Sequence, residues 1–153
     1  MMSEYRARVQ WQRGDQVFSD HRYSRAHVWN FDGGVSVAAS SAPSSVPVPL
    51  SDPAAVDPEE ALIAATSSCH MLFFLSLAAK AGFVVDLYED EAYGRMDRDD
   101  RGKMAVVEIV LRPKVQWVGE GPSEAQLEAL HYRAHEDCYV ANSLRAEVRV
   151  ETF

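Results

Sequence analysis

The fold is decided by residues 57–82, which read DPEEALIAATSSCHMLFFLSLAAKAG. Asp57 has a typical N-cap side chain, Pro58 fits the first helical position, and Glu60 stands where a capping-box partner belongs. The interior of the segment is apolar almost all round, and a glycine closes it. We therefore predict a long helix from Pro58 to about Ala81.

About twenty apolar residues, from Ala61 to Ala79, could also span a bilayer. Polar side chains at Thr66–Ser68, His70 and Ser76 interrupt the run, and no aromatic belt or basic flank accompanies it. We therefore expect no membrane partner and a helix that is enclosed by protein. One small sheet cannot cover such a helix on every side, which favours a homodimer that shares its core.

Alternating apolar and polar residues predict strands on both sides of this helix. The Ser40–Val56 segment, rich in proline and serine, is predicted to be a long loop. The element order β-β-β-α-β-β-α-β predicts an α+β fold, with an antiparallel sheet and a long buried central helix. The strands are expected at 5–12, 26–31, 35–39, 83–94, 104–117 and 144–151, with a second helix from Pro122-Ser123-Glu124 to about Asp137.

The composition and the motifs that the sequence lacks exclude several classes of function. A chain of 153 residues that is 47% hydrophobic can build one ordinary core, so we predict a single domain over residues 1–153. Its net charge of -8 disfavours nucleic acid as a partner. The first eight residues have neither the apolar core nor the cleavage site of a signal peptide, which predicts a cytoplasmic protein. Because no phosphate loop, Gly-x-Gly-x-x-Gly or Gly-x-Ser-x-Gly motif is present, we expect no nucleotide or serine-hydrolase chemistry and no cofactor.

Two cysteines stand in unlike settings. Cys69 lies inside the apolar helix, whereas Cys138 follows a polar segment just before the last strand. A permanent disulfide is not expected in a reducing compartment, so the thiols are inert core residues, metal ligands or a redox couple. His131, His135 and Cys138 stand at i, i+4 and i+7, and with Cys69 as a fourth ligand they could form a zinc-binding module.

Two motifs resemble the family of osmotically inducible protein C (OsmC) and organic hydroperoxide resistance (Ohr) proteins. The first runs from Asp57 to Cys69, and its cysteine follows Glu59 by ten residues; the second is Cys138-Tyr-Val-Ala-Asn142-Ser143-Leu144. The resemblance spans nearly the whole chain. It implies an intertwined homodimer and a thiol-dependent peroxidase without a metal, which reduces organic hydroperoxides through a Cys69 sulfenic acid that Cys138 resolves.

The same resemblance implies the other catalytic residues. In the family, an arginine from the N-terminal strands activates the reactive cysteine and is held by the glutamate that opens the helix. Arg25 is the best positional match, with Arg22 as its competitor, and Glu59 is the matching carboxylate. A cation is needed because Cys69 lies too far from the helix N-terminus to use its positive end, and burial alone raises the pKa of a thiol. The reductant implied is a dithiol of the lipoyl type.

The chain departs from the peroxidase pattern at two positions. His70 follows Cys69 where an apolar residue is commoner, and Tyr139 follows Cys138 where proline is common. Neighbouring helix positions point about 100° apart, so we expect His70 to face away from the Cys69 thiol. These departures keep open a catalytically silent member that binds a small apolar ligand, beside the metal-binding module.

Overall fold

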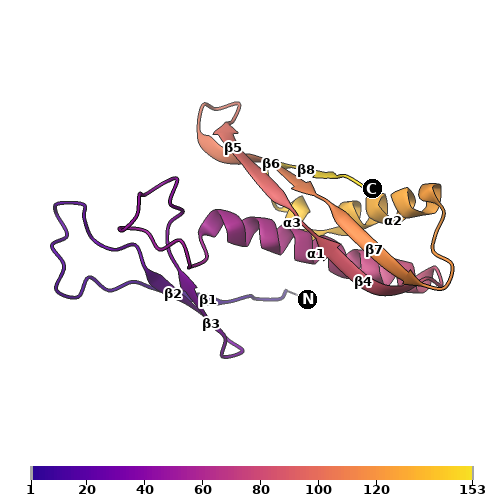
Figure 1. The fold of residues 1–153 in the computed structure, drawn as a ribbon, viewed down its shortest axis with the longest axis horizontal. Coiled ribbons are helices and arrows are strands. Elements are labelled where there is room, and N and C mark those ends of the chain that lie inside the picture. Colours follow the sequence, from indigo (N-terminus) through magenta and orange to yellow (C-terminus); the bar gives the residue numbers. More distant parts are fainter. Residues whose placement is uncertain (1, 153) are drawn as a thin grey trace. The chain divides into compact units, whose positions relative to one another are not determined.

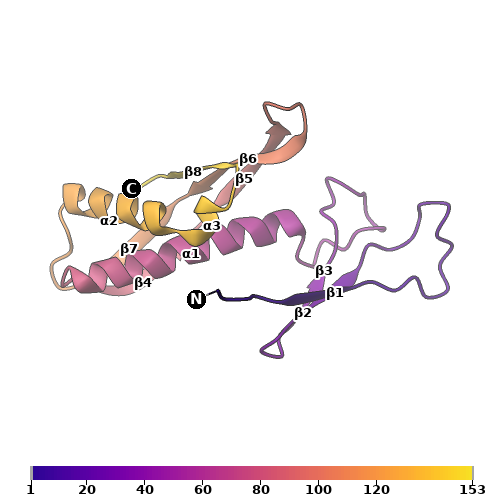
Figure 2. The same ribbon diagram turned by 180° about the vertical axis from the view of Figure 1, so that it is seen from behind.

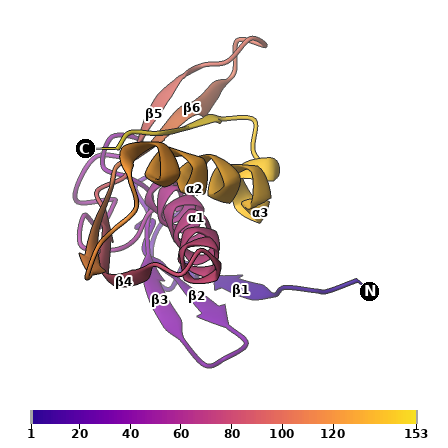
Figure 3. The ribbon, with the colours of Figure 1, turned by 90° about the vertical axis from the view of Figure 1, so that its right-hand side faces the viewer.

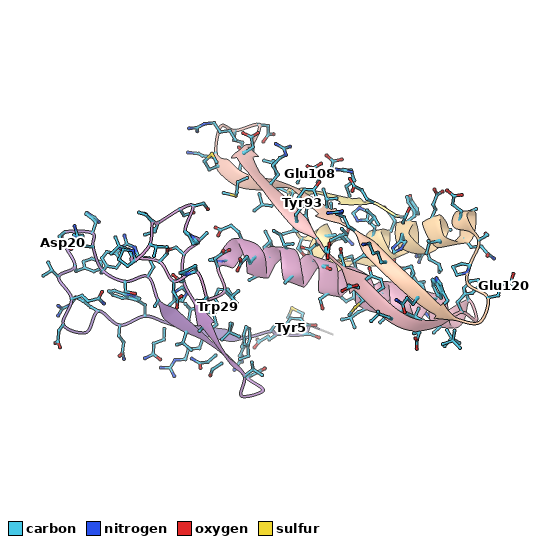
Figure 4. The ribbon with its side chains drawn as sticks, in the orientation of Figure 1. Tyr5, Asp20, Trp29, Tyr93, Glu108 and Glu120 are labelled. Carbon is cyan, nitrogen blue, oxygen red and sulfur yellow. The ribbon has the colours of Figure 1, made fainter. Side chains whose placement is uncertain are left out.

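The computed structural model describes residues 2–152 and forms two compact units, Met1–Ala61 and Leu62–Phe153 (Figure 1). In the first unit, β1 (Ala7–Gln10), β2 (His27–Phe31) and β3 (Ser36–Ala39) pair in sequence order and antiparallel. Trp29, labelled on β2 in Figure 4, donates from its indole Nε1 to His27 Nε2 at 3.0 Å. The three strands predicted before the helix are confirmed and form an antiparallel meander. The single domain predicted for residues 1–153 stays a prediction.

The predicted loop leads back to β3 before the helix begins. Ser40 N–H donates to the Val56 carbonyl, and Val56 N–H donates to the Ala38 carbonyl, each at 3.0 Å. The Ser40 hydroxyl also accepts a hydrogen bond from Asp52 N–H at 3.0 Å. These contacts satisfy backbone groups of an irregular segment and fix the point where the chain enters the helix.

The central helix α1 (Pro58–Lys80) begins and ends as its caps predict. Asp57 Oδ1 accepts from Glu60 N–H at 2.8 Å, and Glu60 Oε2 accepts from Asp57 N–H at 3.3 Å, which completes the capping box. At the other end, Gly82 has a φ of +85°, and Phe83 N–H donates to the Ala78 carbonyl at 3.0 Å. This is the Schellman arrangement, in which a left-handed glycine ends the helix.

The two long strands predicted after α1 are each broken in two. The first becomes β4 (Val84–Asp90) and β5 (Tyr93–Arg98), and the second becomes β6 (Met104–Leu111) and β7 (Pro113–Val118). Asp90 lies at the break, because its Oδ1 accepts from Arg112 N–H at 2.6 Å and its Oδ2 accepts from the Ser67 hydroxyl of α1. The hairpin therefore divides into a β4–β7 pair and a β5–β6 pair in different sheets.

The last strand, β8 (Glu147–Val150), joins β6 in parallel, whereas the other strand pairs of residues 2–152 are antiparallel. Glu108, labelled on β6 in Figure 4, pairs with Arg149 of β8 at 3.3 Å and with Arg95 of β5 at 3.5 Å. The predicted α+β class and antiparallel pairing are confirmed, with this one parallel addition.

The core of the second unit lies between α1, α2 (Glu124–Asp137) and the β4–β7 pair. Figures 2 and 3 show α2 and the short α3 (Tyr139–Asn142) running beside α1. Phe74, Ala78 and Ala134 form its fully buried centre. The buried residues of α1 recur every fourth position, at Thr66, His70, Phe74 and Ala78, so a single face of the helix is covered within the chain.

The rest of α1 is apolar but largely exposed. Only 22% of its most apolar 18-residue window is buried, and the Leu72 side chain is 61% exposed. By length and composition α1 is the one helix of residues 2–152 that could cross a membrane, a test that core helices of soluble proteins also pass. Within the second unit, this part of the apolar helix surface is not covered.

Candidate functional site

The two thiols meet where α1 passes the end of α2. Cys69 is partly exposed on α1, Cys138 is completely buried between α2 and α3, and both are free. The Cys69 side chain is close enough to Cys138 to raise the pKa of its thiol. The fold thus brings together the two cysteines that the sequence separates widely, although it describes them as thiols rather than as a disulfide.

Cys138 is held tightly by its local backbone. Its N–H donates to the His135 carbonyl at 3.3 Å, and its Sγ accepts from Ala141 N–H at 3.4 Å, so it both ends α2 and begins α3. Burial first, and then the nearby Cys69 side chain, raise the pKa of the Cys138 thiol to about 11. Cys138 is therefore protonated at neutral pH and can donate a hydrogen bond to its partner.

One turn further along α1, an aromatic ring pair forms a second contact between α1 and the C-terminal helices. Phe73 follows Cys69 by four residues, and its ring meets that of Tyr139 edge-on, with centroids 4.9 Å apart and planes at 88°. Such an edge-to-face pair is a favourable aromatic geometry. Tyr139, which departs from the family pattern, thus packs α3 against α1 directly beside the thiols.

A pair of histidines lies next to the thiols on the buried face of α1. His70 Nε2 and His131 Nδ1 are 3.0 Å apart, the two rings are within 7° of parallel, and the side chains are 1% and 3% exposed. The Phe74 ring stacks on His131 with centroids 4.2 Å apart. His70 therefore occupies the core-facing row of the helix, where its imidazole is held by α2.

Both imidazoles are neutral at physiological pH. Burial, with smaller contributions from His131 and His135, lowers the pKa of His70 to about 3. Burial likewise lowers the pKa of His131 to about 4. Within residues 2–152, His70 Nδ1, His131 Nε2 and His135 Nδ1 are buried without a hydrogen-bond partner. The contact between His70 and His131 is thus one N–H donor facing one nitrogen lone pair.

The proposed activating residues belong to the first unit. Arg25 is half-buried: its guanidinium carbon lies 3.8 Å from the centre of the Tyr23 ring, and Nη1 donates to the carbonyls of His21, at 2.9 Å, and Tyr23. Arg22 is exposed, which makes it the less constrained of the two candidate cations. Arg25 therefore has the fixed geometry that a binding or catalytic arginine needs.

Arg25 also lines a pocket of about 460 Å³ with largely apolar walls. Trp11, Phe18 and Tyr23 form an aromatic cluster there, and the stacked rings of Phe18 and Tyr23 have centroids 4.7 Å apart. Glu59 is half-buried in the first turn of α1, and within residues 2–152 it forms no ion pair with Arg25. The link between this glutamate and arginine stays a prediction.

The zinc-binding alternative receives no geometric support. Among residues 2–152, no group of three or more His, Cys, Asp or Glu side chains is arranged to hold a metal ion. His131 directs Nδ1 to His70, and Cys138 directs its sulfur to Ala141 and Cys69. His131 and Cys138 thus have other partners in this arrangement, and the zinc-binding module stays an alternative interpretation of the i, i+4, i+7 spacing.

The His70–His131 contact was missed by sequence reasoning. We expected His70 to face away from the thiol and considered His131 only as a metal ligand. The available signal was the four-residue repeat Thr66, His70, Phe74, Ala78, which marks one helix face. That repeat predicts burial of His70, but no local pattern says that another histidine, 61 residues further on, will be its partner.

Comparisons with known proteins agree with the motifs. The OsmC-like protein family model matches residues 51–153. An OsmC-like protein of unknown function from Vibrio cholerae is 51% identical, with a TM-score of 0.97 over 99% of this chain and 100% of that chain. Comparison with curated proteins gave no match.

More distant structures share the fold. The organic hydroperoxide resistance protein OhrB of Bacillus subtilis is 16% identical, with a TM-score of 0.68 over 99% of this chain and 98% of that chain. An organic hydroperoxide resistance protein OsmC from Legionella pneumophila is 15% identical, with a TM-score of 0.69 over 99% and 96%. Family match, close relative and shared fold lead to one conclusion: this chain belongs to the OsmC-like protein family.

Proposed function

We propose that the protein is a cysteine-based peroxidase that reduces organic hydroperoxides to alcohols. The observation that carries the proposal is the proximity of Cys69 to Cys138, close enough to raise the pKa of the Cys138 thiol, in a chain of the OsmC-like family. Two inert core thiols need not meet, whereas a redox couple must. Fold neighbours described as organic hydroperoxide resistance proteins support the same chemistry.

We infer which thiol attacks the peroxide and which one resolves the sulfenic acid from their different surroundings. Cys69 is the more accessible sulfur, so it attacks the peroxide as a thiolate. Cys138 is buried, and its raised pKa keeps it protonated in the resting protein, as suits a resolving thiol that reacts second. Arg25 supplies the positive charge that stabilises the Cys69 thiolate, and Glu59 orients Arg25. This assignment of Arg25 rests on the motif match and on its fixed, half-buried guanidinium.

The proposed reaction balances without a cofactor. The Cys69 thiolate attacks one peroxide oxygen, the O–O bond breaks, and the alkoxide takes up a proton and leaves as the alcohol. The resulting sulfenic acid condenses with the Cys138 thiol, forming a disulfide and releasing water. An external dithiol, of the lipoyl type by family resemblance, then returns two electrons and two protons by thiol–disulfide exchange. We propose a reducing, cytoplasmic compartment for the protein, because a dithiol must reset the disulfide after each cycle.

Intact-mass measurement tests the proposal directly. The reduced wild type, treated with one equivalent of cumene hydroperoxide, should lose two hydrogen atoms. Cys138→Ser should instead gain one oxygen atom, because its sulfenic acid has no resolving thiol. Cys69→Ser is the matched control and should remain unchanged. An unchanged wild-type mass would exclude the peroxidase and favour the catalytically silent, ligand-binding alternative.

We also propose that the protein works as a homodimer. The exposed apolar face of α1, with Leu72 61% exposed, is the surface that a second copy would cover. Sedimentation analysis of the wild type beside Leu72→Asp tests this assignment. A wild-type dimer that dissociates in the variant is expected, because a charge would be buried at the interface. A monomeric wild type at micromolar concentration would contradict it.

A further inference from the structure

We propose that the His70–His131 hydrogen bond positions the Cys69–Cys138 couple and sets how readily its disulfide forms. The inference rests on the proposed redox function, because it assigns these histidines a role for that same thiol pair. They are positioning residues: each acts through the backbone of the segment that carries a cysteine.

Their places in the chain provide the mechanical link. His70 directly follows Cys69, so fixing its side chain fixes the turn of α1 that holds the thiol. His131 lies seven residues before Cys138 on α2, about 10 Å along a rigid helix. The contact of 3.0 Å between Nε2 and Nδ1 thus ties the two thiol-bearing segments together, one residue from Cys69 and two helical turns before Cys138.

The His70–His131 contact has the directional geometry of a hydrogen bond, which hydrophobic packing alone does not require. The rings lie within 7° of parallel, which keeps donor and acceptor in one plane, and Phe74 stacks on His131 to hold that plane. His70 Nδ1 and His131 Nε2 are buried without partners within residues 2–152, which costs free energy that two apolar side chains would avoid. A role in directional positioning accounts for this cost.

Disulfide chemistry is sensitive to such positioning. A disulfide forms only within a narrow range of Cα separations and sulfur dihedral angles. The Phe73–Tyr139 contact holds the next turn of α1 against α3, so the two ring pairs restrain the thiols from two directions. Loosening the histidine contact should lower the effective concentration of one thiol at the other, and the disulfide should become easier to reduce.

The test is the equilibrium between the reduced protein with oxidised dithiothreitol and the protein disulfide with reduced dithiothreitol. His70→Phe keeps a ring but removes the hydrogen bond, and should lower the equilibrium constant about tenfold, which is about 30 mV towards easier reduction. His70→Gln keeps a polar nitrogen at similar reach and should stay within about twofold of wild type. Tyr132→Leu, an exposed substitution on α2, is the control for general effects on that helix.

His131→Phe should reproduce the effect of His70→Phe, and the double variant should show no more than either alone, since one hydrogen bond is lost in all three. Equal constants in wild type, His70→Phe and His131→Phe would overturn the inference. So would an equal shift in His70→Gln, because bulk and not the hydrogen bond would then matter.

A wild-type measurement covers the case in which no variant folds. Imidazole ¹⁵N resonances of His70 and His131 should shift between the reduced and disulfide forms. Unshifted His70 and His131 resonances would overturn the inference. Because dithiothreitol replaces the hydroperoxide, a protein that forms the disulfide but reduces no peroxide would refute the proposed function alone; a protein that forms no disulfide would refute the positioning role.

Discussion

Two neighbouring pairs join α1 to the C-terminal helices, and they differ in chemistry and in burial. The Cys69–Cys138 pair combines a partly exposed sulfur with a buried one, while both members of the His70–His131 pair are buried and neutral. One residue of helical rotation thus separates a partly exposed thiol from a fully buried imidazole. A helix can leave one side chain accessible while the next residue makes the rigid contact.

The largest effect should come from the thiol pair. Cys69→Ser removes the attacking sulfur, so hydroperoxide consumption should fall to the rate without protein. Cys138→Ser should retain one rapid turnover and then stop, because its sulfenic acid cannot be resolved. Stopped-flow consumption of cumene hydroperoxide separates the two outcomes. Equal single-turnover rates in Cys69→Ser and wild type would show that the roles are assigned wrongly.

The next effect concerns the ring that supports the imidazole pair. Phe74 is fully buried and stacks on His131, so Phe74→Ala should reduce the free energy of unfolding by about 3–5 kcal/mol. Urea denaturation of the wild type and of Phe74→Ala measures this difference in the free energy of unfolding. Tyr132→Ala, at a side chain 69% exposed, is the control and should stay within about 0.5 kcal/mol of wild type. Similar losses in both variants would contradict the core described here.

Acid should weaken the imidazole pair. The pKa values of His70 and His131 in the folded protein, about 3 and about 4, lie below the ordinary 6.5, so as pH falls the unfolded chain binds protons first. Their stability contribution is complete above pH 6.5 and is lost from there down to about pH 3–4, at up to about 1.4 kcal/mol per pH unit for each group.

Urea midpoints between pH 7 and pH 5 check this prediction, with an expected loss of about 2–4 kcal/mol from the two histidines. His135 is the other ionisable group whose charge acts on His70. His70→Phe should flatten the profile by about half. A variant with the wild-type slope would show that His70 is not the buried neutral group described here.

The smallest effect lies at the start of α1, far along the helix from both pairs. Asp57→Ala removes the side chain that caps Glu60 N–H and should cost about 1 kcal/mol. Asp57→Ser keeps a capping oxygen and should recover most of that loss. Thermal unfolding at pH 7 measures both. A loss of several kcal/mol would mean that Asp57 has a further contact.

Much of this fold could be predicted because its signals are local. The Asp57–Glu60 capping box, the closing Gly82 and the strand alternation act over a few residues. The broken strands were missed because their cause is not local: Asp90 bonds both Arg112 N–H and the Ser67 hydroxyl. The parallel β6–β8 pairing was missed for the same reason, since alternation gives a strand but not its neighbour.

The candidate site also contains some contacts that the sequence could predict and others that it could not. Cys69 and Cys138 were predicted as partners through the resemblance, and the fold brings Cys69 close enough to Cys138 to raise the pKa of its thiol. The His70–His131 contact had no such guide, because His70 departs from the family pattern and neutral buried histidines leave no charge pattern in the sequence. Arg25 and Glu59 stay predictions from the motif.

The packing around Gly94 on β5 predicts how this position varies among homologues. A Cβ atom added at Gly94 would lie 2.7 Å from Cδ1 of Ile63 in α1 and 3.3 Å from Cγ1 of Val106. The helix therefore occupies volume that any larger residue at position 94 would need. In homologues, positions 63 and 94 should vary together: a lineage that acquires alanine at 94 should carry a shorter side chain at 63, and a library that randomises both should recover such pairs.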